Sequence, residues 1–213
     1  MIAILVAYMV LVGLPPFSAE DAAKVAGASC RHGCIVGDDG WVYELQRRDL
    51  EWLGRAVECE AGVYGAGEQS AVAWALSQQL YQWHKRGLRP TLSAVVQSYS
   101  SCCSAKWSSE GPWHHDRITA RADYYRALDW GDIPARTRTF VLDWVAGFHP
   151  NAMPGIVWWF AHGFEKHAPC EAIGPFYANG PIERGNVYYK LQQTVFWKPW
   201  TVRLVPATQE VNL

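Results

Sequence analysis

Residues 49–64 read DLEWLGRAVECEAGVY, and the apolar residues in this stretch recur every three or four positions. This spacing predicts an amphipathic helix that buries one face. Because Asp is a common residue at helix starts, we expect Asp49 to cap this helix and the helix to run to about Tyr64. Glu60 interrupts the apolar face, which makes it the most informative residue of the chain.

On a helical wheel of about 100° per residue, apolar side chains lie within about 60° of Glu60. They belong to Leu53, Ala56, Val57, Val63 and Tyr64. Glu58 projects from the opposite side of the helix, near Arg55. A carboxylate among apolar neighbours is costly to ionise, so it either keeps its proton to higher pH or receives dedicated hydrogen bonds. Such a group suits a general acid, although an internal ion pair with Arg121 or Arg138 explains its position equally well.

Much of the remaining chain also has helical periodicity. Helices are predicted over residues 68–85, 92–99, 118–128 and 134–147. Thr91 is expected to cap the second of these, and Pro134 to start the last. Residues 155–163 and 185–197 are dense in Val, Ile, Trp, Tyr and Phe, which is typical of short strands or extended aromatic loops. The predicted fold is therefore mainly α, with short strands or extended aromatic loops toward the C-terminus.

The composition indicates a folded chain without affinity for nucleic acid. Half of the 213 residues are hydrophobic, which is enough to bury a core in one domain with an appendage. Nineteen Lys and Arg residues balance twenty Asp and Glu residues, and no basic cluster offers a surface for phosphates. We divide the chain into an apolar segment (1–19), a Cys/Gly-rich loop region (20–48), a main domain (49–198) and a tail (199–213).

Residues 1–14 are almost wholly apolar. A helix of this length covers about 21 Å, less than the roughly 30 Å of a bilayer core. The segment is similar to the apolar part of a signal peptide, but no Lys or Arg precedes it. A membrane anchor and a helix that docks on a partner protein are the alternatives. We expect the protein in the periplasm or cell envelope, outside the cell, or in a phage particle.

The six cysteines, an even number, allow 15 disulfide connectivities and fit an oxidising compartment. They are Cys30, Cys34, Cys59, Cys102, Cys103 and Cys170. Disulfide bonding at residues 30–34 is favoured over a zinc site made by Cys30, His32 and Cys34 with Cys170 or His167, because the one-residue spacing is unusual for zinc ligands. Cys102 and Cys103 are expected to bond to different partners, since a bridge between neighbours strains the backbone.

The surroundings of Glu60 resemble a known family. The stretches WLGRAVECEAG (52–62) and GEQSAVAWAL (67–76) are similar to the opening of the catalytic domain in bacterial cell-wall hydrolases related to spore cortex-lytic enzymes. The similarity continues through LSAVVQ (92–97) toward Trp107. It extends to GIVWWF (155–160) and NVYY (186–189).

This resemblance implies a lysozyme-like helical domain that binds peptidoglycan glycan strands. It also implies cleavage of the β-1,4 bond between N-acetylmuramic acid and N-acetylglucosamine, with Glu60 as the acid. Aromatic rings present flat apolar faces on which sugars stack. The candidates for glycan contacts are Trp107, Trp158 and Trp159 as platforms, with His162 and Tyr188 as polar lining groups. For each of them, packing in the core is the alternative.

A glycoside hydrolase usually has a second carboxylate, for which Glu68, Glu110 and Asp116 are the candidates. None of the three has a spacing that identifies it. A lytic transglycosylase needs only one carboxylate, so the sequence favours transglycosylation. No cofactor is expected. The sequence disfavours a zinc peptidase built on residues 114–116 with His162 or His167, since it contains no His-Glu-x-x-His helix.

A noncatalytic role is the second hypothesis: a structural component of a virion or envelope assembly with a lysozyme-like shell. Its support is the apolar segment at 1–14 and the twelve tryptophans, both of which suit protein contacts.

Overall fold

The computed structural model describes residues 30–151, 156–161, 171–172, 186–190 and 202–206, with the backbone alone for the second to fourth of these ranges. The described chain is mainly helical, as predicted. Its helices are α3 (Arg47–Ala61), α4 (Ala66–Lys85), α5 (Leu92–Tyr99), α6 (Asp116–Ala127) and α7 (Ala135–Val145), with a 3-10 turn η1 (Trp130–Asp132). Its strands are β1 (Cys34–Gly37), β2 (Val42–Glu44), β3 (Ile156–Ala161), β4 (Glu171–Ala172), β5 (Asn186–Lys190) and β6 (Val202–Val205).

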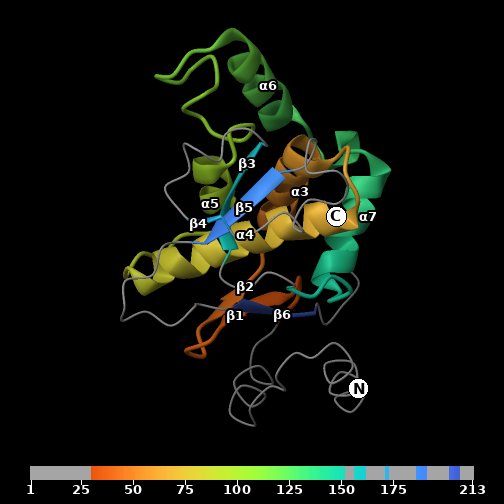
Figure 1. Ribbon diagram of the computed structural model, residues 1–213. Coiled ribbons are helices and arrows are strands. Elements are labelled where there is room, and N and C mark those ends of the chain that lie inside the picture. The colour runs from red at the N-terminus through yellow and green to blue at the C-terminus, as the bar shows by residue number, and fades with distance from the viewer. Residues whose placement is uncertain (1–29, 152–155, 162–170, 173–185, 191–201, 207–213) are drawn as a thin grey trace.

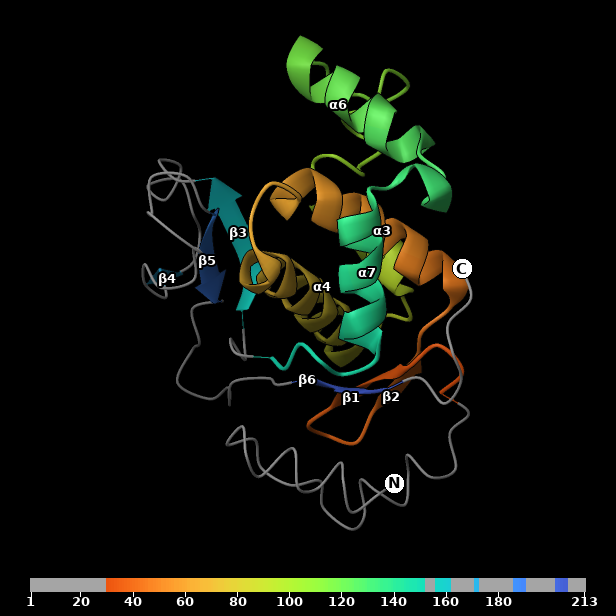
Figure 2. The ribbon, with the colours of Figure 1, turned by 90° about the vertical axis from the view of Figure 1, so that its right-hand side faces the viewer.

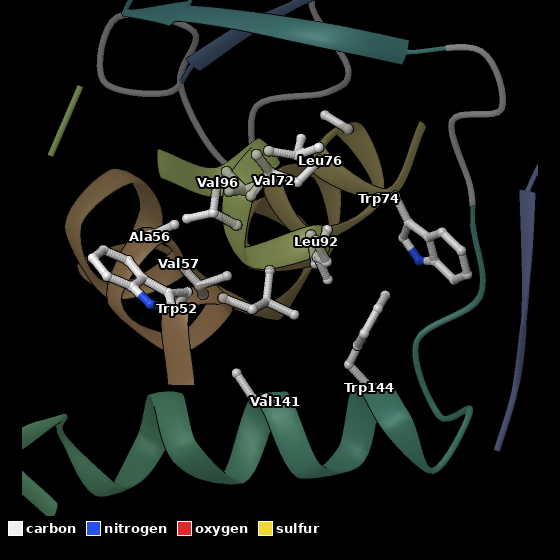
Figure 3. Close-up of a cluster of buried hydrophobic side chains, with 14 of the residues drawn as sticks. Trp52, Ala56, Val57, Val72, Trp74, Leu76, Leu92, Val96, Val141 and Trp144 are labelled. Carbon is white, nitrogen blue, oxygen red and sulfur yellow. The ribbon is translucent and has the colours of Figure 1, made fainter. Parts of the chain in front are cut away.

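Helices α3, α4, α5 and α7 surround one hydrophobic core (Figures 2 and 3). Figure 3 shows Ala56 and Val57 of α3 facing Val96 of α5, while Val141 of α7 points toward them from below. These four side chains are at most 1% exposed. Trp144 of α7 is also fully buried and meets Trp74 of α4 edge to face, with ring centroids 5.5 Å apart. The apolar periodicity of the sequence therefore corresponds to a real common core.

Two small antiparallel sheets flank the helices. One has the strand order β2-β1-β6 and lies at the end of the molecule opposite α6 (Figures 1 and 2). In the other, of order β3-β5-β4, strand β3 lies against α4. The extended segments expected within 155–163 and 185–197 are thus strands β3 and β5. Strand β6, within the segment 199–213, pairs with β1 from the Cys/Gly-rich region, so the first sheet joins chain segments that are far apart in sequence.

The ends of the predicted helices differ by a few residues from the observed ones. Helix α3 starts at Arg47, and its N-cap residue is Gln46 and not Asp49 as predicted. Asp49 is the third residue of the helix, and its Oδ2 accepts the N–H of Gln46 at 2.9 Å in a capping box. The helix ends at Ala61, so the expected burial of Val63 is wrong, and this side chain is 83% exposed. The prediction for Thr91 is confirmed, since its Oγ1 accepts the N–H of Ala94 at 3.1 Å.

The predictions for residues 1–14 lie outside the described residues. Among the helices that are described, none is both long and apolar enough to span a bilayer.

Candidate active site

Glu60 lies in the last turn of α3 and is half-buried. Its Oε1 accepts a hydrogen bond from the hydroxyl of Ser100 at 2.8 Å. Ser100 directly follows α5 and is completely buried, so its hydroxyl is fixed in place. The same Oε1 lies 3.5 Å from Sγ of Cys102. That sulfur carries no proton because it is bonded to Cys59, so the two atoms are in contact without a hydrogen bond.

Glu58, two residues earlier, faces a different element. Its Oε1 lies 3.3 Å from Nη2 of Arg136, and its Oε2 accepts the hydroxyl of Thr137. Both partners belong to α7, and only 11% of the Glu58 side chain is exposed. Glu58 and Glu60 therefore point apart, as the helical wheel predicted. Glu58 ties α3 to α7, whereas Glu60 reaches the segment after α5.

A disulfide joins the two segments that meet at Glu60. It links Cys59 of α3 to Cys102 in the turn after α5, and a second disulfide links Cys30 to Cys34 at the start of β1. Among the described residues, Cys103 is the one cysteine with a free thiol. Burial raises the pKa of this thiol to about 12, and the nearby charge of Glu60 acts in the same direction. The thiol stays protonated near neutral pH and is no nucleophile.

Helix α6 crosses this region and contributes two arginines. Arg121 donates to the main-chain carbonyl of Cys59, and Arg126 donates to that of Cys103 at 2.8 Å. The first contact satisfies a carbonyl in the last turn of α3, where a helix attracts positive charge. Arg138, the other proposed ion-pair partner of Glu60, donates to the carbonyl of Gly131 at 3.0 Å. The two arginines of α6 thus hold the backbone next to Glu60 in the chain and in the turn after α5.

The three candidates for a second carboxylate occupy dissimilar positions. Glu68 on α4 is completely buried in the core. Glu110 is exposed in the loop between α5 and α6. Asp116 is 97% exposed at the start of α6, where its Oδ1 lies 3.3 Å from Nε2 of His114. None of them shares the half-buried position of Glu60.

Among the aromatic residues predicted to contact a glycan, the structure describes the side chain of Trp107. Trp107 is half-buried and meets Trp113 edge to face, with ring centroids 5.2 Å apart. Trp113 is not among the predicted glycan contacts; it is 47% exposed, and Nζ of Lys106 lies 5.0 Å from its ring centroid. The twelve tryptophans of the chain were the signal in the sequence that could have indicated Trp113.

The other aromatic candidates lie on strands β3 and β5. Trp158 and Trp159 belong to β3 and Tyr188 to β5, where the backbone register pairs Trp159 with Tyr188. His162 lies outside the described residues.

The zinc hypothesis for residues 30–34 is wrong, because Cys30 and Cys34 are bonded to each other and cannot act as thiolate ligands. In the part of the chain that the structure describes, no group of three His, Cys, Asp or Glu side chains could hold a metal ion. The proposed ligands His167 and Cys170 lie outside that part.

A separate pocket of about 230 Å³ lies between the start of α4 and the segment after α7. It is lined by Ala66, Gly67, Ser70, Trp74, His149, Pro150 and Asn151. The ring of His149 packs on Phe140, with centroids 4.7 Å apart, and its main-chain carbonyl accepts the indole N–H of Trp74 at 2.9 Å. Burial lowers the pKa of His149 from its ordinary value of 6.5, although the charge of Asp143 opposes this effect.

The lowered pKa of His149 predicts a loss of stability in mild acid. The unfolded chain takes up this proton near pH 6.5, whereas the folded chain resists it, so the contribution of His149 is complete above that pH and falls below it. We expect the urea midpoint to fall less between pH 7.5 and 5.5 in His149→Gln than in the wild type. His114→Gln, at an exposed position, controls for removal of an imidazole. An equal fall in wild type and His149→Gln would contradict this assignment.

Comparison with protein-family models, curated proteins and solved structures finds no match for this chain.

Proposed function

We propose that this protein degrades peptidoglycan as a lytic transglycosylase of the lysozyme-like type, with Glu60 as its acid and base. The observation that carries the proposal is the position of Glu60: a half-buried carboxylate in the last turn of a core helix, oriented by the hydroxyl of Ser100. The neighbouring Glu58 links α3 to α7 through Arg136 and Thr137, so the two glutamates of this helix have separate roles.

In the proposed reaction, the carboxyl group of Glu60 donates its proton to the glycosidic oxygen between N-acetylmuramic acid and N-acetylglucosamine. Positive charge develops on the muramic acid ring as the bond breaks. The resulting carboxylate accepts the proton of the C6 hydroxyl of the same sugar, and that oxygen closes a 1,6-anhydro ring. One carboxylate performs both proton transfers. A mechanism with one carboxylate needs no second acidic residue beside Glu60. This agrees with the positions of the candidates Glu68, Glu110 and Asp116, none of which resembles that of Glu60.

The disulfides support a site of action in the periplasm, the envelope, outside the cell or in a virion, since disulfides persist in oxidising surroundings. Peptidoglycan is a component of the bacterial envelope, which a protein in any of these places can meet. Trp107 and the exposed Trp113 are proposed to contact the glycan strand, together with Trp158, Trp159, His162 and Tyr188. Residues 1–14 are proposed to contact a membrane or a partner protein.

The proposal is tested by digestion of purified peptidoglycan and mass spectrometry of the released muropeptides. We expect products with 1,6-anhydro ends from the wild type. Products with reducing ends would show hydrolysis instead. Absence of product from folded protein would favour the structural role in a virion or envelope assembly.

A further inference from the structure

The disulfide between Cys59 and Cys102 lies directly beside the proposed acid. Cys59 precedes Glu60 in the chain, and Cys102 follows Ser100 by two residues. The bridge therefore connects the residue next to the acid with the turn that supplies the hydrogen-bond donor of the acid. The sulfur of Cys102 is in contact with the same carboxylate oxygen that accepts the Ser100 hydroxyl, at 3.5 Å and 2.8 Å respectively.

Non-covalent contacts also hold the turn that carries Ser100, since the N–H of Ser100 donates to the carbonyl of Val96 at 2.9 Å. The N–H of Cys103 donates to the carbonyl of Ser100 at 3.1 Å and closes the turn. Arg126 holds the carbonyl of Cys103 from α6. The disulfide is the covalent restraint among these contacts, and it closes a loop of 43 residues that contains α4 and α5. Opening a loop of this length adds freedom mainly to the unfolded chain, so reduction lowers the stability of the fold and leaves the turn at Ser100 without its covalent link to α3.

Reduction changes the contacts of Glu60 in two ways. A dithiol supplies two electrons and two protons, the sulfur–sulfur bond breaks, each cysteine becomes a thiol, and the dithiol becomes a cyclic disulfide. The two sulfurs then repel each other until they are about 3.5 Å or more apart. Cys59 and Cys102 are 5% and 1% exposed, so the thiolate of the dithiol reaches a sulfur only when the turn after α5 opens locally, and the displacement occurs inside the packed core. The new thiol of Cys102 also gains a proton that it can donate to the carboxylate of Glu60, in competition with Ser100.

We propose that the Cys59–Cys102 disulfide is a redox-sensitive positioning device for Glu60, which makes the enzyme active when oxidised and largely inactive when reduced. This inference rests on the proposed function. A displacement of about 1 Å at a reacting group lowers rates by about 100-fold. We therefore expect kcat to fall about 100-fold on reduction while KM changes little, because the proposed glycan contacts lie outside the loop that the disulfide closes.

The test compares oxidised protein with protein reduced by dithiothreitol, using release of muropeptides at several peptidoglycan concentrations. Reoxidation with oxidised glutathione is expected to restore the rate. The matched control is Cys30→Ala with Cys34→Ala, which removes the disulfide at β1 and is expected to keep the full redox response. Circular dichroism separates a loss of kcat in folded protein from global unfolding, and global unfolding on reduction would overturn the inference.

Ser100→Ala provides an independent measurement that retains the disulfide. In the oxidised state we expect Ser100→Ala to have a lower kcat than the wild type. Reduction of this variant is expected to lower kcat little further, because the substitution and the reduction remove the same restraint on Glu60. Fully additive losses, or equal kcat in the reduced and oxidised wild type, would overturn the inference and leave the proposed function intact. If the oxidised wild type releases no product, the proposed function itself fails.

Discussion

Replacement of Glu60 by Gln is expected to lower the rate of peptidoglycan cleavage by about 10²- to 10⁴-fold, the usual contribution of a general acid. A glutamine has almost the same shape, and its carbonyl oxygen can still accept the hydroxyl of Ser100. It has no acidic proton to donate to the leaving oxygen. We therefore expect the thermal unfolding temperature to change little while kcat falls.

Glu58→Gln is the matched control, because it alters the same helix two residues away. It weakens the contacts to Arg136 and Thr137, and we expect a loss of about 1 kcal/mol in unfolding free energy, since the Arg136 side chain is largely exposed. Its kcat is expected to stay within a few-fold of the wild type. Comparison of the two variants by muropeptide release and thermal unfolding separates catalysis from packing. If Glu60→Gln retained full activity, Glu60 would have no part in the reaction.

The largest expected effect on stability belongs to Asp49→Ala. The carboxylate of Asp49 is 1% exposed and accepts three hydrogen bonds from three parts of the fold. Oδ2 accepts the hydroxyl of Tyr43 at 2.8 Å and the N–H of Gln46 at 2.9 Å, while Oδ1 accepts the N–H of Ser93 at 2.8 Å. Asp49 thereby joins β2, the start of α3 and the first turn of α5.

An alanine at position 49 removes the acceptor of these three donors, of which the N–H of Ser93 makes a buried bond and the other two make partly buried ones. At about 1 kcal/mol or more for each, the free energy of unfolding is expected to fall by about 3–5 kcal/mol. For a chain of this length, that corresponds to a melting temperature about 10 °C lower, measured by calorimetry or circular dichroism.

Tyr43→Phe removes one donor to Asp49 and the acceptor of the Leu92 N–H at 3.1 Å, and it serves as the comparison for Asp49→Ala. Burial raises the pKa of the Tyr43 hydroxyl, and the charge of Asp49 raises it further, so this group remains a donor throughout the accessible pH range. A loss of about 1 kcal/mol is expected for Tyr43→Phe. A similar, small loss for Asp49→Ala would show that water replaces the missing carboxylate.

The sequence was sufficient for the helices, because their apolar residues repeat at a local spacing. It also distinguished Glu60 from Glu58, since two positions on one helix differ in direction by a fixed angle. The same local information could not show that Asp49 is the third residue of the helix and not its N-cap. Both arrangements place an acidic residue near the helix start, and only the backbone geometry separates them.

Tertiary structure alone decided the features that depend on contacts between distant residues. The pairing of β1 with β6 joins residues 34–37 to 202–205, and no periodicity within either segment encodes it. In the same way, the six cysteines allowed many connectivities until folding placed Cys59 beside Cys102. The sequence by itself determined that an acidic side chain would interrupt an apolar helix face. Folding decided that a serine forty residues away would hold that side chain, because hydrogen bonds depend on distance in space and not along the chain.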